Sequence, residues 1–154
     1  MTDNTPTFDA EAWLAKERDH TARAASVRPQ NKTVLFDALA RHGITTVTVE
    51  FDGYGDSGQI EDIAVTAGDQ PAALPDETIP LARAEWDVPG IVHVTHSVRE
   101  AIETLVYDLL QQTHAGWENS DGAYGDITFD VTERTITLDY NERHMESDYS
   151  QHVF

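Results

Sequence analysis

The feature that most constrains the fold is an order of apolar patterns that occurs twice along the chain. Residues 31–66 and 97–140 each begin with apolar side chains at helical spacing and continue into two runs in which apolar and polar residues alternate. Alternation with a period of two places the apolar side chains on one face of a strand. The sequence therefore predicts an α+β fold, in which an antiparallel sheet of about four to six strands carries helices on one face. Two repeated helix–strand–strand units are one interpretation of this order.

The alternating runs also predict which side chains enter the core. The inward positions of the two hairpins are apolar: Val47, Val49, Phe51, Ile127, Phe129, Val131, Ile136, Leu138 and Tyr140. Threonine, aspartate and glutamate are common at the outward positions between them. We therefore expect the second face of the sheet to be exposed to solvent and acidic.

The clearest helix is predicted to begin after Ser97, which forms the capping-box pattern S-x-x-E with Glu100. A broad stripe of apolar residues follows at helical spacing. Short strands are expected at residues 81–88 and 91–96, and the proline-rich residues 67–80 are expected to form a loop.

The N-terminal part of the chain predicts two helices that are separated by a proline. The first, over residues 8–26, has a thin apolar stripe, and Pro29 is expected to end it because proline lacks a backbone N–H group. The second covers residues 31–42 and is expected to stop at Gly43. The expected organisation is a single domain over residues 1–154, with a peripheral N-terminal helix over residues 1–28 and an α+β core over residues 29–154.

The formal net charge of −18 is concentrated in two blocks. Residues 50–87 contain ten acidic and one basic side chain, a net charge of −9, and residues 116–154 contain nine acidic and two basic side chains, a net charge of −7. Residues 1–49 are neutral, with six side chains of each sign. Such acidic blocks repel phosphate backbones, so direct binding of nucleic acid is disfavoured. They attract cations and the basic surfaces of other proteins.

The acidic blocks contain two segments rich in glycine and aspartate, and these are the candidate partner-binding segments. Tyrosine and tryptophan are enriched in protein interfaces, and carboxylates beside them suit a basic partner. The candidate partner-binding residues are Asp52, Tyr54, Asp56, Glu61, Asp62, Trp117, Glu118, Asp121, Tyr124 and Asp126. A second interpretation is that glycine and aspartate are present because they form turns.

The same carboxylates leave open a site for Ca²⁺ or Mg²⁺, because these ions prefer oxygen ligands. The spacing D-x-x-x-D-x-G that starts at Asp52 does not match the EF-hand pattern, however. The chain contains no cysteine, which excludes a thiolate zinc site and a cysteine nucleophile. No motif identifies a reaction and no cofactor is predicted, so we expect a protein that is not an enzyme.

The sequence gives no indication of contact with a membrane. No apolar run approaches the roughly 20 residues of a membrane-spanning helix. The first residues show neither the basic nor the apolar region of an export signal. We therefore expect a cytoplasmic protein.

Three segments of the chain, FDGYGDSGQIE, AIETLVYDLLQQTHAGWENSDGAYG and ITFDVTERTITLDYNER, resemble an uncharacterised family of small acidic bacterial proteins. The family is encoded on plasmids, integrative elements and phages, and the resemblance covers about residues 31–154. It has no assigned activity, so the resemblance implies no catalytic residue. The frequent position of its genes beside anti-restriction genes implies a role in the biology of mobile elements.

These observations lead to hypotheses from different classes. The first is a non-enzymatic acidic protein of mobile-element origin that docks on a basic protein surface, as a nucleic-acid mimic or an inhibitor of a nucleic-acid-binding host defence enzyme. The alternative is a divalent-cation-binding module or metal-dependent enzyme that uses the two Gly/Asp-rich turns. A third is a homo-oligomer or a subunit of a larger complex, held together through the helix at residues 97–114 or an open sheet edge.

Overall fold

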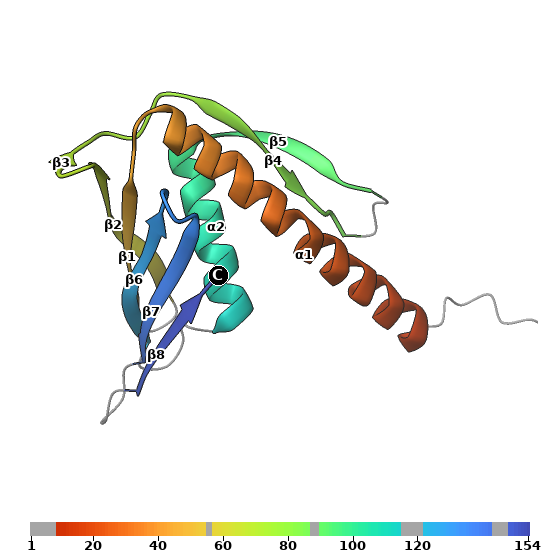
Figure 1. Ribbon diagram of the computed structural model, residues 1–154. Coiled ribbons are helices and arrows are strands. Elements are labelled where there is room, and N and C mark those ends of the chain that lie inside the picture. The colour runs from red at the N-terminus through yellow and green to blue at the C-terminus, as the bar shows by residue number, and fades with distance from the viewer. Residues whose placement is uncertain (1–8, 55–56, 87–89, 115–121, 143–147) are drawn as a thin grey trace, which may run out of the picture.

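The computed structural model describes residues 9–54, 57–86, 90–114, 122–142 and 148–154 of the chain. Within these residues the chain forms two α-helices and eight β-strands (Figure 1). The helices are α1 (Ala10–Arg41) and α2 (Val98–Thr113); the strands are β1 (Thr46–Tyr54), β2 (Ser57–Ala67), β3 (Gln70–Pro71), β4 (Thr78–Arg83), β5 (Val92–Ser97), β6 (Ala123–Asp130), β7 (Thr135–Glu142) and β8 (Asp148–Val153). The predicted α+β class is confirmed.

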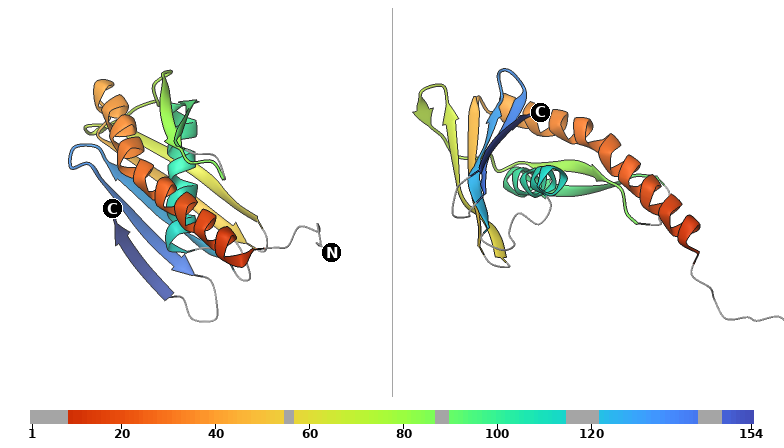
Figure 2. Two further views of the ribbon diagram at one scale, coloured as in Figure 1. Left: turned by 90° about the vertical axis from the view of Figure 1, so that its right-hand side faces the viewer. Right: turned by 90° about the horizontal axis from the view of Figure 1, so that it is seen from below.

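Six of the described strands form one antiparallel sheet in the order β3-β2-β1-β6-β7-β8. Both described helices lie on the same face of this sheet (Figure 2). The first helix leads into the β1–β2 hairpin and the second into the β6–β7 hairpin, and the two hairpins meet along β1 and β6. The repeated helix–strand–strand order predicted from the sequence is therefore present, with β4 and β5 forming a separate two-stranded ribbon.

The hydrophobic core lies between the sheet and the helices. The side chains predicted to point inward are all buried, from Val47 and Val49 on β1 to Leu138 and Tyr140 on β7. They form one cluster with the buried faces of α1 and α2. Burial of a large apolar side chain contributes about 1.5–3 kcal/mol relative to its exposure. This layer therefore decides which face of the sheet packs against the helices and which face remains free.

The N-terminus of α2 has the predicted capping box. The N–H group of Glu100 donates to the Ser97 hydroxyl oxygen at 3.1 Å, and the N–H group of Ser97 donates to the Glu100 carboxylate at 3.2 Å. The helix ends at Thr113. The prediction of a helix after Ser97 is confirmed.

The prediction of two N-terminal helices was wrong, because α1 runs without interruption through Pro29. A proline in a helix interior costs about 3 kcal/mol, since it removes one hydrogen bond and crowds the preceding turn. Here Pro29 is exposed, whereas Val27 and Asn31 are buried on the opposite side of the helix. Because buried residues both precede and follow the proline in the sequence, the helix stays continuous. The helix axis curves along its length (Figure 2). The N-terminal half of α1 extends away from the sheet (Figure 1).

The side chain of Asn31 attaches α1 to the β4–β5 ribbon. Its amide nitrogen donates to the carbonyl oxygen of Ala82 at 2.8 Å, and its carbonyl oxygen accepts from the N–H group of Ala82 at 2.8 Å. Asn31 is only 8% exposed, so neither bond competes directly with water. The sequence did not predict this contact.

Three strands also differ from the prediction. β3 lies inside the segment 67–80 that was expected to be a loop, and β4, which spans Thr78–Arg83 instead of residues 81–88, begins inside the same segment. The sequence did not predict β8, and its pairing with β7 completes the sheet at one edge. No helix in the described residues is both long and apolar enough to cross a membrane.

Candidate functional site

The candidate functional site is the face of the six-stranded sheet that is turned away from the helices, which we call the open face. The six described strands of this sheet contain no lysine or arginine. Their acidic residues are Glu50, Asp52, Glu61, Asp62, Asp126, Asp130, Asp139, Glu142 and Asp148. These strands therefore carry negative side chains that no lysine or arginine of the same strands offsets.

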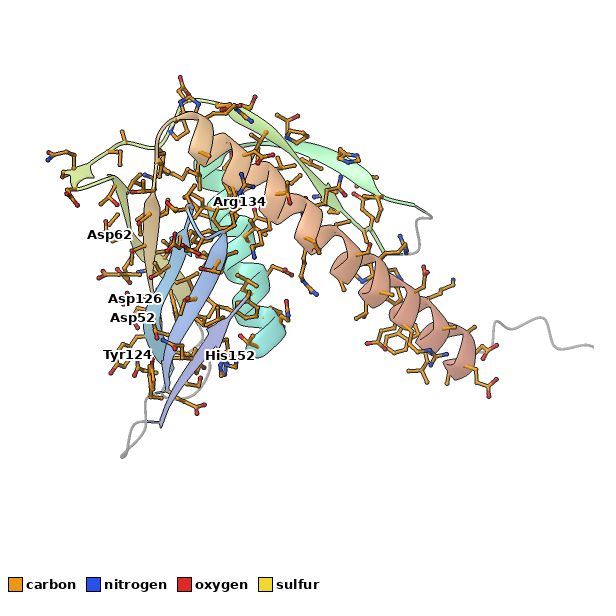
Figure 3. The ribbon with its side chains drawn as sticks, viewed as in Figure 1. Asp52, Asp62, Tyr124, Asp126, Arg134 and His152 are labelled. Atoms are coloured by element: carbon orange, nitrogen blue, oxygen red, sulfur yellow. The ribbon has the colours of Figure 1, made fainter. Side chains whose placement is uncertain are left out.

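Four of these acidic residues form a row across adjacent strands. Asp62 of β2 lies directly opposite Glu50 of β1. Glu50 also lies opposite Asp126 of β6, which in turn lies opposite Asp139 of β7. Residues that are directly opposite each other project from the same face, with Cβ atoms about 4.5–5.5 Å apart. Figure 3 shows Asp62 and Asp126 on the side of the sheet away from the helices, and we call these four residues the carboxylate row.

A second row beside the carboxylate row carries aromatic and amide side chains. Asp52 lies opposite Tyr124, and Asn141 lies opposite both Tyr124 and Tyr149. The two tyrosines are 39% and 62% exposed. A shallow hollow of about 360 Å³ at these rows is lined by Glu50, Phe51, Asp52, Glu61, Tyr124, Gly125, Asp126 and Asn141.

A glycine fixes the position of the row on β6. Gly125 lies opposite Phe51, directly before Asp126 in the sequence. A Cβ atom at residue 125 would clash with the backbone carbonyl oxygen of Asp139 and would lie 3.1 Å from Cζ of Phe51. A residue with a side chain does not fit here without displacement of a strand. The close approach of β6 and β7 therefore depends on this glycine.

A β-bulge gives the opposite end of the row an additional carboxylate. The register of β1 with β2 shifts between Glu50 and Phe51, so that Asp62 and Ile60 are paired and Glu61 is the extra residue of β2. A bulge also increases the local twist of the strand that carries it. Glu61 is exposed beside the row and accepts a hydrogen bond from Nε2 of Gln59 at 2.8 Å.

Neutral donors cover the end of the row at β7. The Tyr149 hydroxyl and the Gln151 amide group each donate a hydrogen bond of 2.6 Å to Oδ1 of Asp139. The bond to Asp139 raises the pKa of the Tyr149 hydroxyl above its ordinary value, because an ionised phenolate would face a carboxylate. The side chains of β8 thus offset part of the charge at Asp139.

The arginines with described ion pairs lie on the helices, the ribbon and the connecting turns. These pairs are Arg23–Asp19, Arg28–Asp108, Arg41–Glu77, Arg83–Glu85 and Arg134–Asp37. In the part of the chain that the structure describes, no ion pair reaches Glu50, Asp62 or Asp126. Among the described residues, Arg99 of α2 lines a hollow together with Glu61 and Asp62, whereas Glu50 and Asp126 at the centre of the carboxylate row take part in no ion pair.

The structure brings half of the predicted partner-binding residues together. Asp52, Glu61, Asp62, Tyr124 and Asp126 lie on or beside the two rows. The side chain of Tyr54 and the residues Asp56, Trp117, Glu118 and Asp121 lie outside the described residues, so their role stays a prediction.

Sequence reasoning missed two members of the row, Glu50 and Asp139. Both occupy outward positions in runs that alternate, which is the signal that marks them as exposed. Their alignment with Asp126 depends on how β1, β6 and β7 pair, and that pairing joins distant parts of the sequence.

Two histidines meet behind the sheet, near the C-terminus of α2. Nε2 of His114 lies 3.1 Å from Nε2 of His152, and the ring of His114 stacks on Tyr140 with ring centroids 3.6 Å apart. Burial, followed by the nearby His152, lowers the pKa of His114. The described residues contain no group of three or more potential ligands that could hold a metal ion.

Comparison with known proteins identifies a family and nothing further. Residues 27–154 match a family of unknown function, DUF6878. No curated protein matches the chain, and no solved structure matches it. The matched region begins within α1 and includes every strand of the open face.

Proposed function

We propose that this chain, which belongs to the DUF6878 family of unknown function, is a non-enzymatic binding protein that docks its open face on a basic surface of another protein. The partner class is a protein whose basic groove otherwise holds nucleic acid. The carboxylate row is the observation that carries the proposal, because it places Asp62, Glu50, Asp126 and Asp139 in line on adjacent strands.

The energetics of the row support a binding role. Like charges directly opposite each other destabilise a sheet, and the row contains three such neighbouring contacts. The free protein retains this repulsion. When a basic surface approaches, each cation reduces the repulsion between neighbouring carboxylates, which contributes favourable free energy to binding. Departures from the rules of stable folding are concentrated at functional sites.

The geometry of the row also suits a competitor of nucleic acid. Neighbouring strands lie about 4.8 Å apart, so the four carboxylates extend over about 14 Å of the sheet. A groove that binds nucleic acid presents arginine and lysine to a line of phosphates, and fixed carboxylates compete for the same cations. Tyr124 and Tyr149 add exposed aromatic surface beside the charges, as in many protein interfaces.

The proposal includes a mobile-element origin and a partner from host defence. The resemblance of the FDGYGDSGQIE segment and the later strands to proteins of plasmids, integrative elements and phages supports this part. Several defence enzymes must bind nucleic acid, so they carry basic grooves of the required kind. An acidic protein that occupies such a groove acts as an inhibitor without any chemistry of its own.

The experiment is affinity capture from a bacterial host lysate with three versions of the protein as bait. One is the wild type, and the row variant carries Glu50→Gln, Asp62→Asn and Asp126→Asn. The control variant carries Asp69→Asn, Asp76→Asn and Glu133→Gln, which are exposed positions outside the row. Both variants change the net charge by the same amount. Thermal unfolding establishes that each bait is folded.

The expected result is a basic protein that binds the wild type and the control variant but not the row variant. Salt at about 0.5 M should release it, because contacts between exposed charges are screened at that ionic strength. Duplex DNA should displace it if the groove holds nucleic acid. Equal capture by the wild type and the row variant, or capture that does not depend on salt, contradicts the proposal.

A further inference from the structure

The two edges of the six-stranded sheet differ in how they are protected. The β2 edge contains the bulge, exposes Glu61 and Asp62, and is partly covered by β3. In addition, the N–H group of Ile60 donates to the hydroxyl oxygen of Tyr107 on α2 at 3.2 Å. Bulges, charges and short covering segments are devices that keep a strand edge from pairing with another chain.

Within the described residues the β8 edge has neither a bulge nor a covering strand, and its one acidic residue, Asp148, is the first residue of the strand. β8 pairs with β7 in regular register over its whole length and contains neither proline nor lysine. The left panel of Figure 2 shows β8, in dark blue, as the outermost strand, with no described element along its free side. Among the large apolar residues that the structure describes, Tyr149 and Val153 are the most exposed, at 62% and 63%, and both are on this strand.

The hydrogen bonds to β7 show which backbone groups of β8 face outward. Phe154 and Ile136 exchange two backbone hydrogen bonds, of 2.8 and 3.2 Å. In an antiparallel pair, residues that bond to the neighbouring strand alternate with residues that do not. The backbone groups of Tyr149, Gln151 and Val153 therefore point to the free edge.

The inner side of β8 is anchored, so the edge is held in place. His152 contacts His114 of α2, with their Nε2 atoms 3.1 Å apart. Nζ of Lys32 on α1 donates to the carbonyl oxygen of Phe154 at 3.1 Å. A strand fixed in this way loses little conformational entropy when it pairs with another strand.

We propose that β8 pairs antiparallel with β8 of a second copy of this chain, with Gln151 opposite its own counterpart on a twofold axis. In this register Tyr149 of each copy lies opposite Val153 of the other. All the outward backbone groups of these three residues then find partners, which gives about six hydrogen bonds. Contacts between an aromatic and a β-branched residue are among the favourable cross-strand pairs.

Charge distribution favours a second copy at β8 and disfavours it at β2. Pairing of two β2 edges would bring Glu61 and Asp62 of both copies together. At β8 the side chains on the open face are neutral, and Tyr149 and Gln151 both donate hydrogen bonds to Asp139 behind the edge. The net charge of −18 on each copy still opposes association, so salt should strengthen the dimer.

The twofold axis would stand perpendicular to the sheet, so the two sheets would continue into one and both open faces would point the same way. Gln151 lies opposite Asp139, so the carboxylate rows of the two copies would follow one line with the two glutamines between them. Self-association through β8 does not depend on the proposed docking of a basic partner.

The first experiment measures the mass of the protein by sedimentation equilibrium over a range of concentrations, at about 0.05 M and about 0.5 M salt. Gln151→Pro removes the outward N–H group together with the amide side chain that donates to Asp139, and leaves the backbone hydrogen bonds to β7 in place. Gln151→Thr is the matched control, because it also loses the amide side chain but keeps the N–H group. We expect dimers for the wild type and the control, tighter at high salt.

The proline variant should associate at least about tenfold more weakly, since it loses two hydrogen bonds across the axis. A wild type that stays monomeric at every concentration and salt overturns the inference. So does a proline variant that dimerises as tightly as the control variant.

A second experiment uses the absence of cysteine from the chain. Gln151→Cys would place two thiols opposite each other on the axis, where Cα atoms of a hydrogen-bonded pair are about 5.5 Å apart, a distance that a disulfide spans. Ala64→Cys is the control, because this exposed residue lies on the β2 edge strand. Oxidation should give a covalent dimer for the 151 variant only. Cross-linking of the 64 variant instead would assign the interface to β2.

The two proposals fail separately. The dimer is measured with the pure protein, and Asp126→Asn should dimerise like the wild type. Loss of partner capture in the row variant, with dimerisation unchanged, supports docking by the carboxylate row. A protein that remains monomeric but still captures a basic partner overturns only the β8 interface.

Discussion

Replacement of Asp126 by asparagine tests whether the carboxylate row stores repulsion in the folded protein. Asp126 lies opposite Glu50 on one side and Asp139 on the other, so it takes part in two of the three close contacts of the row. Asparagine has nearly the same shape and removes only the charge. We expect this variant to be more stable than the wild type.

The magnitude follows from Coulomb's law. Two unit charges about 6 Å apart in water repel by about 0.7 kcal/mol, so two neighbours contribute about 1.4 kcal/mol at low ionic strength. At about 0.15 M salt the Debye length is about 8 Å, which reduces this to about 0.7 kcal/mol, and at about 1 M it nearly vanishes. For a chain of this length, about 1 kcal/mol raises Tm by about 2–4 °C.

The assay is urea denaturation of the wild type and the Asp126→Asn variant at about 0.02, 0.15 and 1 M salt. The control is Asp69→Asn, which makes the same replacement at an exposed turn position outside the row. We expect a gain in the free energy of unfolding for Asp126→Asn that decreases as salt increases, and a smaller change for the control. A loss of stability at low salt would show that a cation offsets Asp126 and would refute the reasoning.

Three further predictions concern the helical layer. Asn31→Ala should lower the free energy of unfolding by about 2–4 kcal/mol in urea denaturation, because it leaves the buried N–H and C=O groups of Ala82 without partners. Pro29→Ala should raise the free energy of unfolding by about 2–3 kcal/mol, because the hydrogen bond that the helix gains outweighs the greater freedom of the unfolded chain. No gain would indicate that α1 is interrupted at this residue. The unfolded chain binds a proton at His114 more readily than the folded chain, in which its pKa is lowered. Stability should therefore fall as pH decreases below about 6.5, and His114→Gln should reduce this dependence in thermal unfolding monitored by circular dichroism.

The sequence predicted the parts of the fold that depend on local patterns. Alternation identified the inward residues of β1, β6 and β7, and Ser97 with Glu100 identified the start of α2, because these signals act between residues close in the chain. Pro29 misled the prediction for the opposite reason. Proline tends to interrupt a helix, but burial of Val27 and Asn31 against parts of the chain some 50 or more residues away opposes this tendency.

The candidate site was only partly predictable, because the carboxylate row is a product of tertiary pairing. Asp62 and Asp126 were identified from the density of charge, whereas Glu50 and Asp139 were not among the candidate residues. The alignment of Glu50 with Asp126 requires the register of β1 with β6, which no local signal contains. The protected β2 edge and the bare β8 edge are likewise visible only once the strand order is known.

The register that creates the row is set by the core on the other side of the same strands. A shift of β6 by one residue would turn Ile127 and Phe129 out of the core, and burial opposes this strongly. A shift by two residues would leave the same side chains on each face of the sheet, but it would move Gly125 away from Phe51. A residue with a side chain would then clash with the ring of Phe51 and with the backbone carbonyl group of Asp139. Close packing behind the sheet therefore holds the carboxylates in line on its open face. The free energy of the repulsion in the row is much smaller than the free energy of apolar burial that a shift in register would lose. The charges therefore remain aligned in the free protein.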